Sequence, residues 1–356
     1  MRLLYLPNEP VLGWQVGARA ALEALQRRGT LSDLRIYSFL QQPPARARDE
    51  ILALCDEAAP DAVLFTKIGH FPVDDRWLEA LRRTRTKPLL IYYDGDIYGR
   101  VFKRLTAETR TMCRHADLVL LCGLGANAQR FEVAGARHIG YLPHNASLAQ
   151  FSTAWTPTAT RTLDVIVIGN RIRGRVALQE RIPWARMPGA FEREQVVKRL
   201  GDVFGPRFAV YGTGWDGFVG NRGPVAFAHQ HQVLRDSWIS VGYDHFPGTP
   251  LYFSDRLPIA LLSGVAHAVH YRPGYESWFQ NGRELLWAHT IDELVELTRD
   301  ALGRGRAYLD ELGARGRRFA QDRLSSEVVF AGVVATIAGM RGRARGLAAA
   351  GSGSRA

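Results

Sequence analysis

Tyr252-Phe-Ser-Asp-Arg-Leu-Pro-Ile-Ala-Leu-Leu-Ser-Gly264 is the stretch of sequence that decides the fold. Ser254 is a natural N-cap, and Pro258 is tolerated in the first turn of the helix that follows such a cap. The apolar run from Leu257 to Leu262 predicts a short buried helix. Gly264 is expected to adopt the left-handed conformation that ends this helix.

A buried strand and an anion site are predicted directly around this helix. Residues 266–271 predict the strand, and Arg272-Pro-Gly274 predicts the turn that ends it. A helix that begins with Ser-Asp-Arg beside a parallel strand offers its N-terminal N–H groups, together with the Arg256 guanidinium, to an anion. The same pattern also occurs in capped helices of α/β proteins that bind no anion. The segments that follow are needed to distinguish an anion site from an ordinary capped helix.

Three further segments follow this strand. The turn Trp278-Phe-Gln-Asn-Gly282 precedes a short strand at Glu284–Trp287 and a helix at Asp292–Leu302. This order resembles the end of the donor domain in GT-B glycosyltransferases and is most similar to the spore-maturation (CgeB-like) and group 1 (family 4-like) enzymes. The resemblance covers roughly the last two-thirds of the chain. It implies that residues near the start of the helix at 257–262 lie under the diphosphate of a nucleotide-sugar.

Two neighbouring positions depart from the family pattern. These enzymes carry Arg-x-Phe-Glu-Ala, in which the Glu holds the donor ribose, whereas this chain has Pro258 and Ile259 in place of the Phe and the Glu. An isoleucine side chain cannot accept a hydrogen bond. Either Asp255 takes over this role or the donor is held differently.

The composition is that of a soluble globular protein. At 356 residues, with 46% hydrophobic and 23% charged residues, the chain is long enough for two domains with separate cores. No stretch approaches the roughly 20 apolar residues that span a bilayer. Pro7 interrupts the N-terminal segment too early for a signal peptide. Cys55, Cys113 and Cys122 are widely spaced, as is typical of reduced cysteines, so we expect a cytoplasmic location.

The net charge of +11 favours anionic partners, which include nucleotide-sugars, an acidic membrane surface and nucleic acid. An arginine-rich proteome would give the same balance without any function. Part of the charge lies in residues 341–356, which hold Arg341, Arg343, Arg345 and Arg355 and no acidic residue. This segment is predicted to be a disordered basic tail.

Residues 1–150 are predicted to form a Rossmann-like domain that binds the acceptor. Apolar strands alternate with helices, which favours a parallel sheet. The strands are expected at residues 2–6, 34–39, 62–65, 88–93, 118–122 and 138–142. No G-x-G-x-x-G follows the first strand, so a dinucleotide cofactor is not expected. By the resemblance, the loop that holds Gly13, Trp14 and Gly17 and the exit segment at His144 face the cleft between the domains.

Residues 160–330 are predicted to form a second Rossmann-like domain, which binds the nucleotide-sugar and follows a linker at about 148–161. Its first strands are expected at residues 164–168, 207–211 and 237–243. The Gly-bearing turns Gly169–Arg175 and Gly212–Trp215 are similar to segments of CgeB-like enzymes. The resemblance implies that the final helix, 325–340, crosses back to the first domain. The predicted fold class is therefore α/β, a GT-B arrangement of two parallel sheets that face a central cleft.

Donor-binding residues are expected at the strand ends of the second domain, because ligands of open α/β sheets sit at the carboxyl ends of the strands. Arg256 is the first candidate for the diphosphate, followed by Arg171 and Arg175, although a solvated loop explains the last two equally well. Trp215 and Tyr275 would stack on the base of the nucleotide or fill the core. The full set of donor candidates is Gly169, Asn170, Arg171, Arg175, Gly212, Gly214, Trp215, His245, Tyr252, Ser254, Asp255, Arg256 and Tyr275.

Asp94 and Asp96 are the first candidates for a catalytic base, because a carboxylate at a strand end can be desolvated and its pKa raised. Turn formation by Asp-Gly-Asp explains the pair nearly as well. His70 is a further candidate for a base or a sugar contact, or for a structural hydrogen bond. The D-x-D spacing is similar to the metal motif of GT-A enzymes, but no metal is expected because the rest of the pattern is GT-B.

Together these features predict a metal-independent, hexosyltransferase-type glycosyltransferase. It would move a sugar from a nucleotide-diphosphate sugar, with a UDP-sugar as the first choice, to a hydroxyl of a glycan, lipid or metabolite. Inversion and retention of the sugar configuration are both open. A different acceptor would be a hydroxymethylated base in duplex DNA, which would have to be flipped out of the helix. A nucleotide-sugar epimerase and a non-catalytic module that binds nucleotide-sugars are also compatible with these features.

Overall fold

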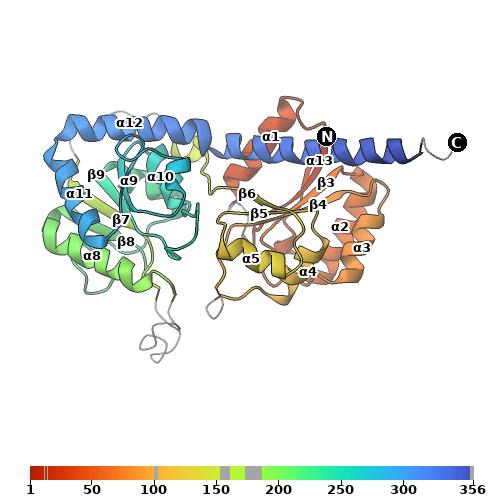
Figure 1. Ribbon diagram of the computed structural model, residues 1–356, viewed down its shortest axis with the longest axis horizontal. Helices are drawn as coiled ribbons and strands as arrows, with labels where there is room; N and C mark the ends of the chain where they lie inside the picture. Colours follow the sequence, from red (N-terminus) through yellow and green to blue (C-terminus); the bar gives the residue numbers. More distant parts are fainter. Residues whose placement is uncertain (12, 14, 100–102, 153–160, 173–186, 353–356) are drawn as a thin grey trace.

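Two parallel α/β sheets lie next to each other along the long axis of the molecule, and one long helix runs across the first (Figure 1). The computed structural model describes residues 1–11, 13, 15–99, 103–152, 161–172 and 187–352, with side chains described as far as residue 343. The first sheet is built from residues 2–141 and the second from residues 163–288. The predicted fold class is confirmed.

The first sheet is parallel throughout, and the first strand of the chain lies inside it, next to an edge strand. Its strands are β1 (Arg2–Leu6), β2 (Asp33–Ile36), β3 (Ala62–Thr66), β4 (Leu89–Asp94), β5 (Leu118–Leu121) and β6 (Ile139–Tyr141). They follow the order β2-β1-β3-β4-β5-β6. Leu3 of β1 is paired with both Leu34 and Ala62, so β1 lies between β2 and β3. The six predicted strands are present, with ends that differ by a few residues.

Helices cover both faces of this sheet because side chains alternate along each strand. Leu4 and Leu6 pack into a core with α2 to α5, whereas Leu3 and Tyr5 pack on the opposite face with α1. The helices are α1 (Val16–Arg27), α2 (Pro44–Ala58), α3 (Asp75–Arg83), α4 (Ala107–His115) and α5 (Ala126–Val133). The short α6 (Leu148–Phe151) follows the sheet and contacts both α1 and α10 (Arg256–Leu262) of the second domain. This burial on both faces explains the mainly apolar sequences of β1, β3, β4 and β5.

The second sheet is also parallel. Its strands are β7 (Leu163–Ile168), β8 (Phe208–Tyr211), β9 (Ser237–Gly242), β10 (Ala266–His270) and β11 (Leu286–Ala288), in the order β11-β10-β9-β7-β8. Its helices are α8 (Ala190–Phe204), α9 (Gln230–Arg235), α10 (Arg256–Leu262), α11 (Ile291–Gly303) and α12 (Arg306–Arg323). Val165 and Ile166 of β7 pack on opposite faces, the first with α8 and α11 and the second with α9 and α10. The second domain therefore repeats the architecture of the first.

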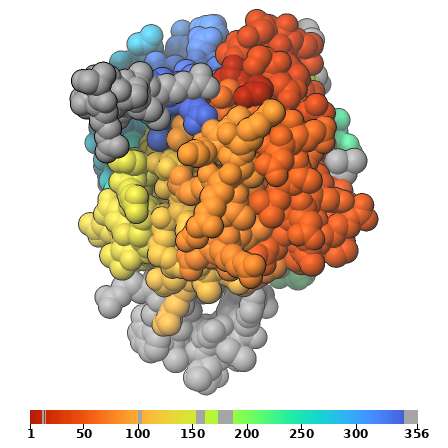
Figure 2. All heavy atoms as spheres, turned by 90° about the vertical axis from the view of Figure 1, so that its right-hand side faces the viewer, coloured from red at the N-terminus to blue at the C-terminus, as the bar shows by residue number. Residues whose placement is uncertain are grey.

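The last helix, α13 (Ser326–Ser352), leaves the second domain and packs on the first beside α1 (Figure 1). Seen from the end of the first domain, α13 (blue) lies near the N-terminal segment (dark red) (Figure 2). Phe330 contacts Tyr5 of β1 edge to face, with ring centroids 6.3 Å apart. The predicted crossing is therefore confirmed.

The end of this helix differs from the sequence prediction. Residues 341–352 continue α13 instead of forming a disordered tail, and residues 353–356 lie outside the described part. Alanine, leucine and arginine are strong helix formers, and several of them occur between residues 341 and 350. Arg341 also fixes the helix, because its guanidinium donates to the carbonyl oxygens of Thr86 (2.7 Å) and Lys87 (3.0 Å).

The stretch at 252–264 forms the predicted helix, but its cap differs. Helix α10 begins at Arg256, and Ser254 does not cap it. The Ser254 hydroxyl donates instead to Oδ1 of Asp244 at 2.6 Å. Gly264 has a φ of +75°, as predicted for the residue that ends the helix.

Close backbone packing behind α10 gives a first testable prediction. A Cβ atom on Gly313 of α12 would lie 2.2 Å from the carbonyl oxygen of Gly264, which is a severe clash with backbone. We expect Gly313→Ala to destabilise the protein by about 2 kcal/mol, measured by denaturant unfolding. Gly332→Ala in α13 is the matched control, because no atom lies within 4 Å of its Cβ position and alanine favours a helix. Equal stabilities of the two variants would contradict this packing.

Among the helices in the described residues, none combines the length and the apolar character needed to cross a bilayer.

Candidate functional site

The carboxyl ends of β7 and β9 define a crevice in the second domain. From β7 the chain continues to β8 on one side of the sheet, and β9 lies on the other side. Open α/β sheets bind ligands at such a switch point, just beyond the carboxyl ends of the strands. Gly169 follows β7, and Tyr243 and Asp244 follow β9. Ligand-binding side chains are therefore expected around these residues.

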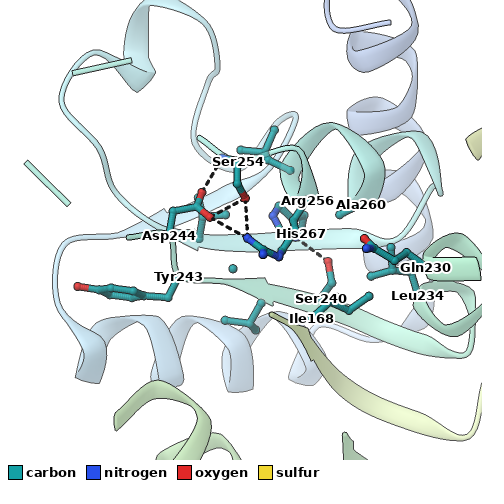
Figure 3. A pocket seen from close by; sticks show the side chains of 14 residues that line it. Ile168, Gln230, Leu234, Ser240, Tyr243, Asp244, Ser254, Arg256, Ala260 and His267 are labelled. Atoms are coloured by element: carbon teal, nitrogen blue, oxygen red, sulfur yellow. Dashed lines mark hydrogen bonds and ion pairs between the residues drawn. The ribbon is translucent and has the colours of Figure 1, made fainter. Parts of the chain in front are cut away.

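Asp244 is the centre of a charged cluster at this crevice (Figure 3). Its carboxylate accepts from the Ser254 backbone N–H (2.9 Å) and hydroxyl (2.6 Å), which ties β9 to the start of α10. The Arg256 guanidinium lies beside it, with Nη1 3.2 Å from Ser254 Oγ and 3.8 Å from Asp244 Oδ1. Arg256, the first donor candidate from the sequence, is thus held at the expected strand ends by Asp244.

Two further arginines that the sequence analysis missed complete this cluster. Arg193, at the start of α8, is 4% exposed and donates from Nε to the Tyr243 carbonyl oxygen at 2.7 Å. Its Nη2 lies 4.0 Å from Asp244 Oδ1. Arg272 is fully buried, donates to the Asp244 carbonyl oxygen at 2.5 Å, and lies over the Tyr243 ring. We call Arg193, Arg256, Arg272 and Asp244 the arginine cluster.

The arginine cluster carries an excess of positive charge. Burial alone would raise the pKa of Asp244, but Arg256, Arg272 and Arg193 lower it to about 2. Burial and the neighbouring Arg256 lower the pKa of Arg193 to about 9, which reflects the cost of holding its charge there. Three guanidinium groups thus face one carboxylate within the described residues. Buried charges are stable only when they are compensated, so this crevice favours an anionic ligand.

The predicted glycine turns bring the backbone close to the cluster. A Cβ atom on Gly169 would lie 3.5 Å from Arg256 Nε, and one on Gly212 would lie 2.4 Å from the Gly169 carbonyl oxygen. Gly214 has a φ of +84° and approaches the Arg171 backbone. Asn170 accepts from Arg193 Nη1 through its carbonyl oxygen (3.1 Å) and from the Thr213 N–H through its side chain (3.0 Å). These turns therefore form one wall of the crevice.

Several donor candidates have side chains that are already paired or buried in the core. Arg171 forms a bidentate ion pair with Glu194 at 2.8 and 2.7 Å, so its charge is compensated. Trp215 and Tyr275 are buried in the core, which leaves neither ring face open for stacking on a base. His245 is also buried, and burial followed by Arg193 lowers its pKa to about 3. Arg175 lies outside the described residues.

The loop between Asp244 and Ser254 docks the arginine cluster onto the first domain. Leu124 N–H donates to the Pro250 carbonyl oxygen at 3.0 Å, and the Tyr141 hydroxyl donates to the Leu251 carbonyl oxygen at 2.8 Å. Tyr252, a predicted donor residue, packs its ring edge against His144 of the first domain. The loop that begins at Asp244 therefore connects the arginine cluster to the first domain.

A cavity of about 530 Å³ lies between the two domains. Gly13, Gly17 and His144, all predicted on the acceptor side, line it from the first domain. Asp255 lines it from the second domain, directly before Arg256 in the chain. Trp14 lies outside the described residues. The cavity therefore joins the predicted acceptor side to the loop that holds the arginine cluster.

Glu9, which the sequence analysis did not select, fixes the loop on the acceptor side. Its buried carboxylate accepts from the Gly13 N–H (2.8 Å), the Gln15 N–H (3.3 Å), the Ser38 hydroxyl (2.8 Å) and the Arg19 guanidinium. Burial alone would raise the pKa of Glu9, but these hydrogen bonds lower it to about 2. The buried Glu9 carboxylate thus holds Gly13 and Gln15, which line the cavity, in place.

Neither of the two predicted carboxylates is free to act as a catalytic base. Asp94 is fully buried and accepts from the hydroxyls of Tyr92 (2.6 Å) and Tyr98 (3.0 Å), so no substrate can contact it. Asp96 lines the cavity, but Lys67 and Lys103 pair with its Oδ2 at 2.5 and 2.9 Å. Although burial raises the pKa of Asp96, these lysines lower it below its usual range, which weakens Asp96 as a base.

His70 is exposed and does not line the cavity. It therefore has no structural support as a base or sugar contact. His70 was a further candidate because it follows β3 closely, but it lies in an exposed turn.

Residues 193–331 match a family described as glycosyl transferase-like. The sequence has no significant match among curated proteins. The CgeB-like affiliation is not tested by this match and stays a prediction.

Solved structures are similar to this chain over nearly its whole length. The HepE protein of Anabaena, in complex with UDP and glucose, has 13% identity and a TM-score of 0.58, covering 95% of this chain and 99% of that one. Sucrose-phosphate synthase from Thermosynechococcus elongatus has 11% identity and a TM-score of 0.60, covering 98% and 100%. A glycosyltransferase from Rickettsia africae has 9% identity and a TM-score of 0.59, covering 94% and 97%. The chain therefore has the two-domain GT-B fold. The residues that match the glycosyl transferase-like model include Arg193, Asp244, Arg256 and Arg272.

Proposed function

We propose that this protein is a glycosyltransferase that binds a nucleotide-diphosphate sugar at the arginine cluster. The observation that carries the proposal is the excess of three guanidinium groups over one carboxylate at the switch point of the second sheet. A diphosphate supplies the missing negative charge and presents several oxygens to these donors. The match of residues 193–331 to a glycosyl transferase-like family supports the same conclusion.

UDP is the first choice of nucleotide. The support comes from HepE, a structure of the same fold that contains UDP together with glucose. In the proposed complex, the diphosphate lies against Arg256 and Arg193, and Gly169 allows its close approach because no side chain intervenes. Asp244 keeps Arg256 in place through Ser254 rather than contacting the donor.

The arginine cluster gives this site a route to catalysis without a metal. The bond between the sugar and the diphosphate breaks with a build-up of negative charge on the leaving oxygen. Positive groups that are already in place lower the energy of this state, because they need no reorganisation during the reaction. Metal independence is therefore part of the proposal. In the part of the chain that the structure describes, no three His, Cys, Asp or Glu residues gather into a candidate metal site.

The acceptor is proposed to enter the cavity between the domains and to present a hydroxyl to the sugar. Asn8, Gln15, Lys67 and His144 offer polar groups on the side of the first domain. Phe227 and Phe330 add apolar surface to the same cavity. A mixed lining of this kind suits a sugar ring or a glycosylated metabolite. Neither the family match nor the similar structures support duplex DNA as the acceptor, and we do not propose it.

Thermal stabilisation by nucleotide-sugars tests this function directly. UDP-, GDP- and TDP-sugars would be added, with EDTA present throughout, to wild type, Arg256→Ala and Arg299→Ala. At a hundredfold excess over Kd, a ligand stabilises the native state by about 2.7 kcal/mol, so one donor is expected to raise Tm clearly in the wild type. Arg256→Ala should lose this shift. Arg299→Ala removes an exposed arginine of α11 that pairs with Glu296, and it should keep the shift.

The opposing result is equally clear. If no nucleotide-sugar raises Tm, or if Arg256→Ala responds like the wild type, the arginine cluster is not the donor site. A shift that appears only when a divalent cation replaces EDTA would contradict metal independence alone.

A further inference from the structure

We infer that the groove between α4 and α5 of the first domain is a second anion site, which binds the phosphate group of a ligand and is separate from the proposed donor site. The two helices lie side by side (Figure 1). The groove between them has a volume of about 550 Å³. None of the residues that line it belongs to the arginine cluster or lines the cavity between the domains.

Positive charge in this groove comes from three arginines. Arg104 lies in the segment before α4, Arg110 on α4 and Arg130 on α5. No acidic residue lines the groove in the part of the chain that the structure describes, and Arg110 forms no ion pair there. The other charged or titratable side chains of the two helices are not in the lining, and they are Glu108, Arg114, His115 and Glu132. The groove therefore has an excess of positive charge.

Arg130 is held on the face of α5 that forms the groove. Its Nη1 donates to the carbonyl oxygen of Ala126, one turn earlier in the helix. Its Nε is buried and has no hydrogen-bond partner among the described residues. A guanidinium group has five N–H donors, so most of them remain for a ligand. Because the side chain is already fixed, an anion that binds here loses less conformational entropy in ordering it.

A second groove in the same domain shows that a high arginine content alone does not produce this charge excess. The groove between α2 and α3 has a volume of about 380 Å³ and is lined by two arginines, Arg76 and Arg83. Asp56 and Glu79 line it as well, and Arg83 Nη2 lies 3.1 Å from Glu79 Oε2. The charges of that groove are balanced, whereas those of the groove between α4 and α5 are not.

The residue types in the groove between α4 and α5 indicate a phosphate with an apolar part attached. Guanidinium groups match pairs of phosphate oxygens, and three of them suit a doubly charged phosphate better than a single carboxylate. Leu105 and Val133 add apolar surface beside the arginines, and the Val133 side chain is 85% exposed. Gln129 adds an amide group. A phosphorylated small molecule and the head group of a phospholipid share this chemistry.

Isothermal titration calorimetry with inorganic pyrophosphate tests the site in the full chain. The proteins are wild type, the double variant Arg110→Gln/Arg130→Gln, Arg256→Ala, and the control double variant Arg76→Gln/Arg83→Gln. Glutamine removes the charge and keeps a high helix propensity. Wild type should bind at two sites. Arg110→Gln/Arg130→Gln should weaken one of them roughly tenfold or more, because charge-assisted hydrogen bonds are lost. The control should bind like the wild type.

The result for each variant separates this inference from the proposed function. A single binding event that only Arg110→Gln/Arg130→Gln loses would support the groove and contradict the donor site. A single event that only Arg256→Ala loses would overturn the groove and leave the donor site in place. The inference is also overturned if the control double variant weakens binding equally, or if the groove binds pyrophosphate only at low ionic strength, where exposed charges are poorly screened.

Hydrogen exchange locates the site without any substitution in the groove. In Arg256→Ala, pyrophosphate should slow the exchange of amides in residues 104–110 and 126–133, and unchanged exchange there would contradict the inference. Co-sedimentation with phosphatidylglycerol vesicles identifies the source of the phosphate. Vesicle binding that Arg110→Gln/Arg130→Gln loses assigns the groove to a phospholipid head group. Pyrophosphate binding without vesicle binding assigns it to a soluble phosphorylated ligand, and binding of neither overturns the inference.

Discussion

Asp244→Asn is expected to lower the free energy of unfolding by about 3–5 kcal/mol, the range seen when one partner of a buried ion pair is removed. Asparagine keeps the shape of the side chain, but it leaves Arg193, Arg256 and Arg272 without their shared carboxylate. It also weakens the hydrogen bonds that hold Ser254 and the start of α10. Denaturant unfolding monitored by circular dichroism measures the loss.

The ionisation of Asp244 also predicts that the free energy of unfolding depends on pH. Because the pKa of Asp244 in the folded protein is about 2, below its usual value of 3.8, the folded state favours the ionised form. This stabilisation is present above the unfolded pKa and is lost as pH falls through the folded pKa. A shift of this size corresponds to about 2 kcal/mol. The stability difference between wild type and Asp244→Asn should therefore narrow between roughly pH 4 and pH 2.

A control and a rescue make this prediction specific. Asp300→Asn removes an exposed carboxylate from α11 and should change stability by less than about 0.5 kcal/mol. Inorganic pyrophosphate should raise the Tm of Asp244→Asn more than that of the wild type, because the variant cluster has a larger uncompensated charge. If Asp244→Asn is as stable as Asp300→Asn, the arginines are compensated in some other way.

Glu9→Gln is the second large effect that we expect, again about 3–5 kcal/mol. The substitution leaves Arg19 without its buried partner and gives the Gly13 and Gln15 N–H groups a weaker acceptor. The folded pKa of about 2 lies below the usual 4.5, so the carboxylate stabilises the protein above pH 4.5 and loses this effect as pH falls towards 2. Urea unfolding at pH 7 and at pH 3 measures both the loss and its decrease in acid.

Glu132→Gln is the matched control, because Glu132 is exposed on α5. It should leave the unfolding midpoint nearly unchanged. A Glu9→Gln protein with wild-type stability would mean that the loop around residues 9–15 does not depend on the buried charge.

The strands and the helix at 256–262 could be predicted because their signals are local. Most strands are short, mainly apolar runs, and Gly264 marks the end of α10 by its need for a positive φ. Arg256 could be placed for the same reason, because it is the first residue of that helix. The failure at Ser254, in contrast, comes from a contact with another element. Its hydroxyl has two possible partners, and the choice of Asp244 depends on a strand that lies ten residues earlier.

The catalytic and donor residues depended on contacts that a sequence pattern does not contain. Asp94 and Asp244 both follow or end a parallel strand, so the reasoning applied to the first would also have selected the second. Tyr98 and Tyr92 bury Asp94, whereas arginines from α8 and from the turn after β10 surround Asp244. Arg193 meets Asp244 only because β7 and β9 are neighbours in the sheet. The sequence had a signal for Asp244 but none for Arg193.

The crossing of α13 onto the first domain sets the order in which the two halves can mature during translation. Val333, Val334 and Ile337 complete the core that Leu22 and Leu25 of α1 begin. These residues leave the ribosome only after the whole second domain has been made. Domains generally fold as units, the N-terminal one first, at about 5–20 residues per second of synthesis. In this protein the second domain can fold first. One apolar face of the first domain stays exposed to chaperones until α13 emerges from the ribosome.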